Sequence, residues 1–259
     1  MNNKVSKHDK NTQIEKYPDK DRLSLGAANL IVQLSRDAAQ ARGYFTIALA
    51  GGSSPKSLYE LLATQAFKEK VDWTKWHVFI GDERLVPENH PDSNFGMAAS
   101  ALISHVPISN ENIHQVNTAI EGEQAAATYE SEIKQVFAGL DTAINSQLPR
   151  LDLILLGLGP DRHTLSLFPG KSSLLEKNKL VVFTNPGVLP PPVDRVSLTL
   201  PVVNNARNII FLVTGAEKAE AVADIIRNEP DYSRPASMVL ASEHTKIVWM
   251  LDETASSRL

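Results

Sequence analysis

A histidine with an aspartate two residues before it follows the most apolar predicted strand of the chain. This strand covers residues 151–159 and contains Gly157 and Gly159, and Asp161 and His163 come directly after it. Histidine is the usual general base near neutral pH, and a neighbouring carboxylate can orient its imidazole or hold a substrate hydroxyl. The six other histidines lack this setting and are interpreted as loop residues, so His163 is the candidate base.

A glycine turn between a buried strand and a helix forms a candidate anion site. Gly51 and Gly52 end the strand, Ser53 and Ser54 follow, and Pro55 stands where a first helical residue is expected. Glycine lets the backbone approach a ligand closely, and the helix start offers free N–H groups with a partial positive charge. A tight turn with a capped helix needs the same residues, so this motif is weak by itself.

Three consecutive charged residues end another predicted strand, residues 76–80. Asp82, Glu83 and Arg84 follow Gly81 at this point. A solvated loop would explain such charges, but they also place acid and guanidinium groups where a substrate would lie. Arginine can pair with a phosphate or with a developing oxyanion.

Two further cations stand near predicted strand ends. Lys218 falls in the first turn of a predicted helix over residues 217–227, where a positive charge opposes the helix dipole. That position is reasonable if an anion normally occupies the same helix end. Arg195 precedes an apolar segment, residues 196–200, and is a second candidate, although a lone surface arginine would mean nothing.

The elements that must position these residues alternate along the chain. Strands are predicted at residues 44–50, 76–80, 151–159, 179–184, 208–214 and 246–251, and helices at 23–41, 53–67, 93–104, 124–138 and 217–227. This alternation predicts a three-layer α/β/α fold with a mainly parallel, Rossmann-like central sheet. Ligands of such sheets bind outside the carboxyl ends of the strands, where the candidate residues stand.

Composition narrows the domain organisation and the partners. We expect residues 1–20 to form a polar, flexible tail with at most one short edge strand, and residues 21–259 to form a single domain.

The absence of cysteine excludes a disulfide scaffold, a thiolate nucleophile and a cysteine-ligated metal. A net charge of −4 argues against a nucleic-acid partner and leaves room for a small anion. No apolar run approaches the roughly 18–20 residues of a membrane span, and no secretory signal is present, which predicts a cytoplasmic protein without a membrane partner.

Taken together and in this order, five segments resemble the 6-phosphogluconolactonase family. They are IALAGGSSPKSLYELL (47–62), WHVFIGDERLVPENHPDSNFGMA (76–98), LLGLGPDRHTLSLFPG (155–170), DRVSLTLPVVNNARNIIFLVTGAEKAEAV (194–222) and IVWMLDETA (247–255). The resemblance implies a Rossmann-like α/β core related to glucosamine-6-phosphate deaminase. It also implies hydrolysis of 6-phospho-D-glucono-1,5-lactone to 6-phospho-D-gluconate, the second step of the oxidative pentose phosphate pathway, without a cofactor or metal.

The resemblance also implies roles for the candidate residues. His163 would activate water, Asp161 would support it, and Arg84 would lie near the lactone or the phosphate. The expected substrate and phosphate contacts are Gly51, Gly52, Ser53, Ser54, Asp82, Arg162, Arg195 and Lys218. The cations among these residues, Arg84, Arg162, Arg195 and Lys218, should converge into one local basic pocket for a phosphorylated sugar lactone.

One departure from the family leaves alternatives open. Arg162 stands where the family usually has glycine between the aspartate and the histidine, so it either strains or crowds the site or adds a contact to phosphate or carboxylate. A non-catalytic sugar-phosphate sensor is the alternative function. An amino-sugar-phosphate deaminase is disfavoured, because Phe168 occupies the place of its proton-relaying glutamate. The sequence leaves the oligomeric state open between monomer and dimer.

Overall fold

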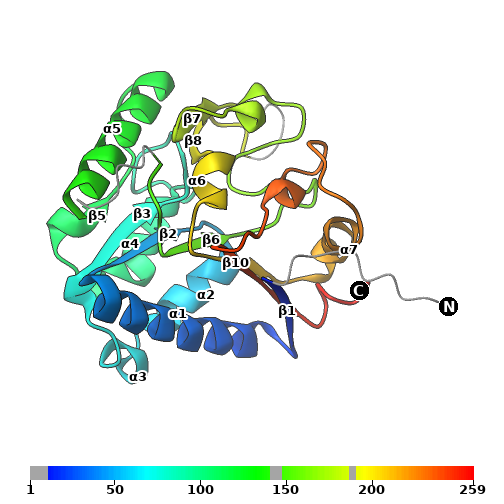
Figure 1. Cartoon of the computed structure of the whole chain (residues 1–259), viewed down its shortest axis with the longest axis horizontal. Helices are drawn as coiled ribbons and strands as arrows, with labels where there is room; N and C mark the ends of the chain where they lie inside the picture. Colours follow the sequence, from blue (N-terminus) through cyan, green and yellow to red (C-terminus); the bar gives the residue numbers. More distant parts are fainter. Residues whose placement is uncertain (1–10, 141–147, 187–190) are drawn as a thin grey trace.

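Parallel strands form the central sheet of the computed structural model, which describes residues 11–140, 148–186 and 191–259. Within those residues the sheet has seven strands in the order β1-β10-β9-β6-β2-β3-β5, and all neighbouring pairs are parallel (Figure 1). Their bounds are β1 Thr12–Tyr17, β2 Phe45–Leu49, β3 Trp76–Ile80, β5 Ile113–His114, β6 Leu153–Leu156, β9 Asn208–Val213 and β10 Lys246–Asp252. The predicted parallel sheet is confirmed.

Helices cover both faces of this sheet. They are α1 Lys20–Arg42, α2 Ser53–Leu62, α3 Gln65–Lys68, α4 Asn94–Ala101, α5 Gly122–Leu140, α6 Leu200–Asn204 and α7 Ala219–Arg227. Side chains alternate across a strand: Ile47 and Leu49 of β2 belong to one apolar core with α1, α2 and α4, whereas Ala48 belongs to the other core with α5, α6 and α7. The two cores give the predicted three layers (Figure 1).

A second, antiparallel sheet was not predicted. It consists of β4 Asp82–Arg84, β8 Arg195–Leu198 and β7 Val181–Thr184, in the order β4-β8-β7. The strand predicted at residues 179–184 exists, but its place in the parallel sheet was wrong. Figure 1 shows β7 and β8 standing above the central sheet. This small sheet brings Arg84 and Arg195 to the carboxyl edge of the large one.

Several boundaries differ from the predicted ones, and two of the differences change how the elements are arranged. The edge strand allowed for in the expected tail is present as β1, which pairs with β10 and extends the sheet to Thr12; residues 1–10 lie outside the described residues. The helix predicted over residues 53–67 divides into α2 and α3 at Ala63 and Thr64. In the described parts of the chain, no helix is both long and apolar enough to cross a bilayer.

Candidate active site

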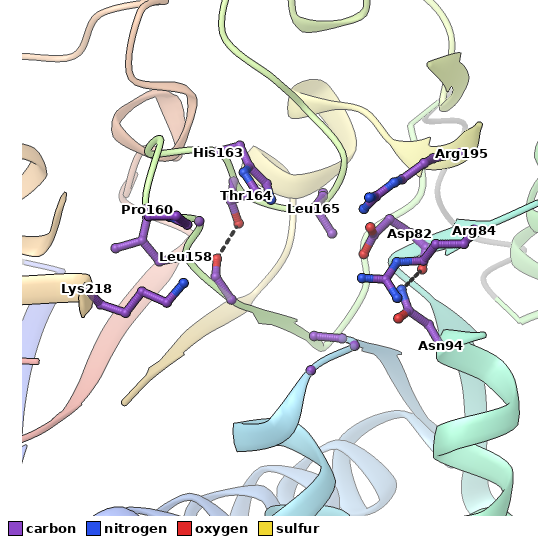
Figure 2. A pocket seen from close by; sticks show the side chains of 15 residues that line it. Asp82, Arg84, Asn94, Leu158, Pro160, His163, Thr164, Leu165, Arg195 and Lys218 are labelled. Carbon is purple, nitrogen blue, oxygen red and sulfur yellow. Dashed lines mark hydrogen bonds between the residues drawn. The ribbon is translucent and has the colours of Figure 1, made fainter. Parts of the chain in front are cut away.

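A cavity of about 250 Å³ lies at the carboxyl ends of β2, β3 and β6, beneath the small sheet. Seven of the predicted site residues line it: Gly51, Gly52, Asp82, Arg84, His163, Arg195 and Lys218. Figure 2 shows His163 above the cavity, Lys218 entering from one side, and Arg84 and Arg195 entering from the other. The structure therefore brings together segments that are more than 160 residues apart in the sequence.

His163 is held by Asp161 through its ring. Nδ1 of His163 contacts Oδ1 of Asp161, and Gly159 N–H donates to the His163 carbonyl at 2.8 Å, which closes a tight turn. Burial by itself would raise the pKa of Asp161, but the hydrogen bond and charge of His163 outweigh burial and lower it. Asp161 is thus a carboxylate acceptor at neutral pH. A neutral imidazole that donates Nδ1–H to this carboxylate keeps a lone pair on Nε2.

Arg84 and Arg195 form a like-charged pair across two strands. They are direct register partners in the β4–β8 ladder, a placement that is unfavourable unless an anion compensates for it. Arg84 donates to the Asp92 carbonyl at 2.7 Å and Arg195 to the Pro191 carbonyl at 3.0 Å, but each Nε is buried without a hydrogen-bond partner in the described residues. Burial, together with the Arg84 charge, lowers the pKa of Arg195. A bound anion would offset the repulsion between the two guanidinium groups.

The turn before α2 offers backbone N–H groups to the same cavity. Gly52, the N-cap of α2, has φ +102° and no side-chain cap, so the first N–H groups of the helix remain open to a ligand. A Cβ at Gly51 would collide with the Asn94 side chain, so this position requires glycine. The hydroxyls of Ser53 and Ser54 do not line the cavity: Ser53 is exposed, and Ser54 bonds to Thr214 at 2.7 Å.

Arg162 requires a correction. Its side chain lies outside the cavity and pairs with Asp224 and Glu220 of α7, so it does not converge with the other three cations. Its backbone has φ +72°, a left-handed conformation that glycine adopts more readily than other residues. The placement of Arg162 in the cavity, as a crowding residue or as a ligand contact, was therefore wrong. The positive φ fits the remaining alternative, a strained backbone at this position.

Two residues at the site, Glu83 and Asn94, were given no role from the sequence, although Glu83 was noted within the charged triplet. Glu83 is 1% exposed and accepts the backbone N–H groups of Asn94 at 2.8 Å, Phe95 at 2.6 Å and Arg84 at 2.7 Å. Burial raises the pKa of Glu83, and these three donors oppose the rise. Asn94 lines the cavity and donates to the Asp82 carbonyl at 2.7 Å. Glu83 thus clamps the strand carrying Asp82 and Arg84 onto the start of α4.

We expect inorganic phosphate to stabilise the protein through Arg195. At about ten times its Kd, a ligand adds roughly 1.4 kcal/mol to the free energy of unfolding, which raises the Tm of a domain of this size by about 3–6 °C. Arg195→Gln should abolish most of this increase in Tm. Without phosphate, the Tm of the variant should be no lower than that of the wild type, because the repulsion between Arg195 and Arg84 is removed. Thermal unfolding with phosphate, against chloride at equal ionic strength, measures both effects. An equal shift in the variant would contradict the assignment.

The fold is that of an α/β protein, and a cavity lined by Arg84, Arg195 and Lys218 lies at the carboxyl edge of its parallel sheet. The model of the family "Glucosamine-6-phosphate isomerases/6-phosphogluconolactonase" matches residues 18–249, and the chain belongs to this family. It is 37% identical over 249 residues to "6-phosphogluconolactonase 3, chloroplastic" of Arabidopsis thaliana, covering 95% of this chain and 75% of the relative. It is 40% identical over 241 residues to "Probable 6-phosphogluconolactonase 3, chloroplastic" of Oryza sativa subsp. indica, covering 92% and 73%.

Solved structures agree with this assignment. The "6-phosphogluconolactonase from Trypanosoma cruzi" superposes with a TM-score of 0.82 at 29% identity, over 98% of this chain and 99% of that one. A monomeric glucosamine-6-phosphate deaminase superposes with a TM-score of 0.78 at 19% identity, over 95% and 100%, which shows the shared fold alone. The predicted family is confirmed.

Proposed function

We propose that the chain hydrolyses 6-phospho-D-glucono-1,5-lactone to 6-phospho-D-gluconate, as the names of its relatives indicate, and that His163 is the general base. The observation that carries this proposal is the Asp161–His163 pair at the rim of a cavity that also holds Arg84, Arg195 and Lys218. A general base and a phosphate-sized cationic pocket are the two requirements of this reaction.

In the proposed mechanism, Nε2 of His163 takes a proton from a water molecule whose oxygen attacks the lactone carbonyl carbon. The carbonyl oxygen becomes an oxyanion, then the bond from that carbon to the ring oxygen breaks, and the ring oxygen takes the proton back from His163. Asp161 stabilises the imidazolium that exists between the two transfers. Base catalysis of this kind raises the reaction rate by about 10²–10⁴-fold. An increase of this size suits an ester that already hydrolyses slowly in water.

The cations of the cavity bind different groups of the substrate in this proposal. We assign the phosphate to Arg195, Lys218 and the N–H groups that begin α2, because these donors approach the cavity from different sides (Figure 2). Arg84 stands beside Arg195 and holds the lactone or the phosphate. Asp82 is buried and accepts from Ser166 at 2.6 Å, which keeps its carboxylate at the cavity wall for a sugar hydroxyl.

The deaminase reaction needs a proton relay that this site lacks at the expected position. Phe168 is 2% exposed and its ring lies 4.7 Å from the His163 ring, centroid to centroid. An apolar ring cannot carry a proton. The sensor alternative gains no support from Arg162, because the side chain of Arg162 does not enter the cavity.

The test is whether the purified protein accelerates loss of freshly generated 6-phosphogluconolactone above the spontaneous rate. Proton release in weak buffer follows the reaction, because each turnover forms one carboxylate. Tight binding of 6-phosphogluconate without acceleration would favour the sensor. The extent of the single domain, the absence of a metal requirement and a cytoplasmic location stay predictions; several plant relatives are named chloroplastic.

A further inference from the structure

Arg162 has an unfavourable backbone conformation directly between the two residues of the proposed catalytic pair. Its φ of +72° lies in the left-handed region, which is unfavourable for a non-glycine residue. Residues in this conformation persist where their surroundings hold them, and such positions cluster at functional sites. The contacts of the Arg162 side chain should therefore show what holds this turn.

Those contacts lead to α7. Arg162 Nε pairs with Oδ2 of Asp224, and Nη2 lies 3.5 Å from Oε1 of Glu220, one helical turn earlier. The Arg162 carbonyl also accepts the N–H of Ala236 at 2.9 Å, from the segment that follows α7. The catalytic turn is thus attached to α7 by a side chain and to the next segment by its backbone.

Asp224 is held in place independently of Arg162. Asn228 Nδ2 donates to its Oδ1 at 2.8 Å, and Arg234 Nη1 lies 3.6 Å from the same oxygen. The carboxylate and its partner are mostly shielded, with 23% of the Asp224 side chain and 28% of the Arg162 side chain exposed. An ion pair with a fixed, partly buried carboxylate restricts motion more than an exposed surface pair does.

The same helix carries a cation of the cavity at its start. Lys218 is the N-cap of α7 and lines the cavity, whereas Asp224 lies further along the helix. We propose that Arg162 is a positioning residue: by tying the turn of Asp161 and His163 to α7, it sets where the His163 imidazole stands relative to Lys218. This proposal rests on the proposed roles of His163 and Lys218.

Arg162→Gly is the direct test, because glycine keeps the left-handed backbone and removes only the side chain. We expect kcat to fall about 3–10-fold, with KM and 6-phosphogluconate affinity within about twofold, because the pocket stays intact while the base is less precisely placed. Asp224→Asn should give a similar loss, and the double variant should be no worse than the poorer single one. Arg227→Ala, on the same face of α7 and without an ion pair in the described residues, is the matched control and should match wild type.

A readout independent of turnover separates this proposal from the proposed function. Imidazole ¹H–¹⁵N signals of His163, assigned by comparison with His163→Gln, should shift or broaden in Arg162→Gly and stay unchanged in Arg227→Ala. A lower Tm with unchanged kcat per folded molecule and unchanged His163 signals would mean a merely structural ion pair and would overturn the proposal. If wild type shows no lactonase activity, the proposed function fails, and the imidazole signals still decide whether Arg162 positions the ring.

Discussion

His163→Gln is expected to lower kcat for lactone hydrolysis by about 10²–10⁴-fold, the share that a general base contributes. Glutamine fills a similar volume and still contacts Asp161, but its amide cannot accept a proton from water at neutral pH. The phosphate-binding groups are untouched, so affinity for 6-phosphogluconate should change by less than about threefold. Initial rates corrected for spontaneous hydrolysis, together with calorimetric titration of the product, measure the two quantities.

The matched control is His244→Gln. His244 is also a histidine beside a carboxylate, 3.1 Å from Glu243, but its side chain is 68% exposed. Its replacement should leave kcat unchanged. Full turnover in His163→Gln would remove His163 from the role of base, and a joint loss of turnover and product binding would indicate a collapsed pocket instead.

The lowered pKa of Asp161 determines the pH range over which its carboxylate is ionised and can hold His163. Because that pKa is lowered in the folded protein, the stabilisation from the ionised carboxylate is fully present above the ordinary value of 3.8 and is lost as pH falls through the folded value. Asp161 therefore stays ionised throughout the neutral range. Loss of activity between pH 5 and 7 would have to come from another group.

The central sheet could be predicted because its strands carry their own signal. Residues 153–156 are apolar on both faces and need no knowledge of their neighbours to be recognised as a buried parallel strand. The small sheet lacks such a signal: β4 is only three charged residues, and its strand conformation depends on β8, more than 100 residues later. Local sequence patterns cannot predict the pairing of β4 with β8, because the two strands are distant in the sequence.

The site shows the same division between local and distant causes. Strand ends and glycine turns identified Gly52, Asp82, Arg84 and His163, because a parallel sheet gathers its carboxyl ends at one edge. The direction of a long side chain depends on its tertiary partner. The partner of Arg162 is Asp224, 62 residues away, so sequence reasoning placed that guanidinium in the wrong cavity.

Glu83 could have been recognised from strand periodicity. In β4 the alternation of side chains places Asp82 and Arg84 on one side and Glu83 on the other. A carboxylate directed away from the ligand needs donors of its own, and the predicted helix start at Ser93 and Asn94 supplies unpaired N–H groups. The charged triplet thus combines two residues that line the cavity with one that anchors the strand.

Gly159→Ala is the second substitution with a large expected effect. A Cβ at Gly159 would stand less than 3.0 Å from His163 Nδ1 and from Asp161 Oδ1, so the two partners must move apart. The φ of Gly159 lies outside the positive range, so alanine adds steric conflict without backbone strain. Displacing a catalytic group by about 1 Å can cost about 10²-fold, and we expect a fall in kcat of that order, with a loss of stability of about 1–3 kcal/mol from overpacking.

Gly157→Ala provides the control within the same turn. Gly157 also lines the cavity and also lacks a positive φ, but a Cβ there meets no atom within 4 Å. Its kcat should stay within about threefold of wild type. Steady-state rates and thermal unfolding of both variants separate the steric effect on the Asp161–His163 pair from a general intolerance of alanine in this turn. If the two variants lose activity equally, the contact between Asp161 and His163 is not what the glycine at position 159 protects.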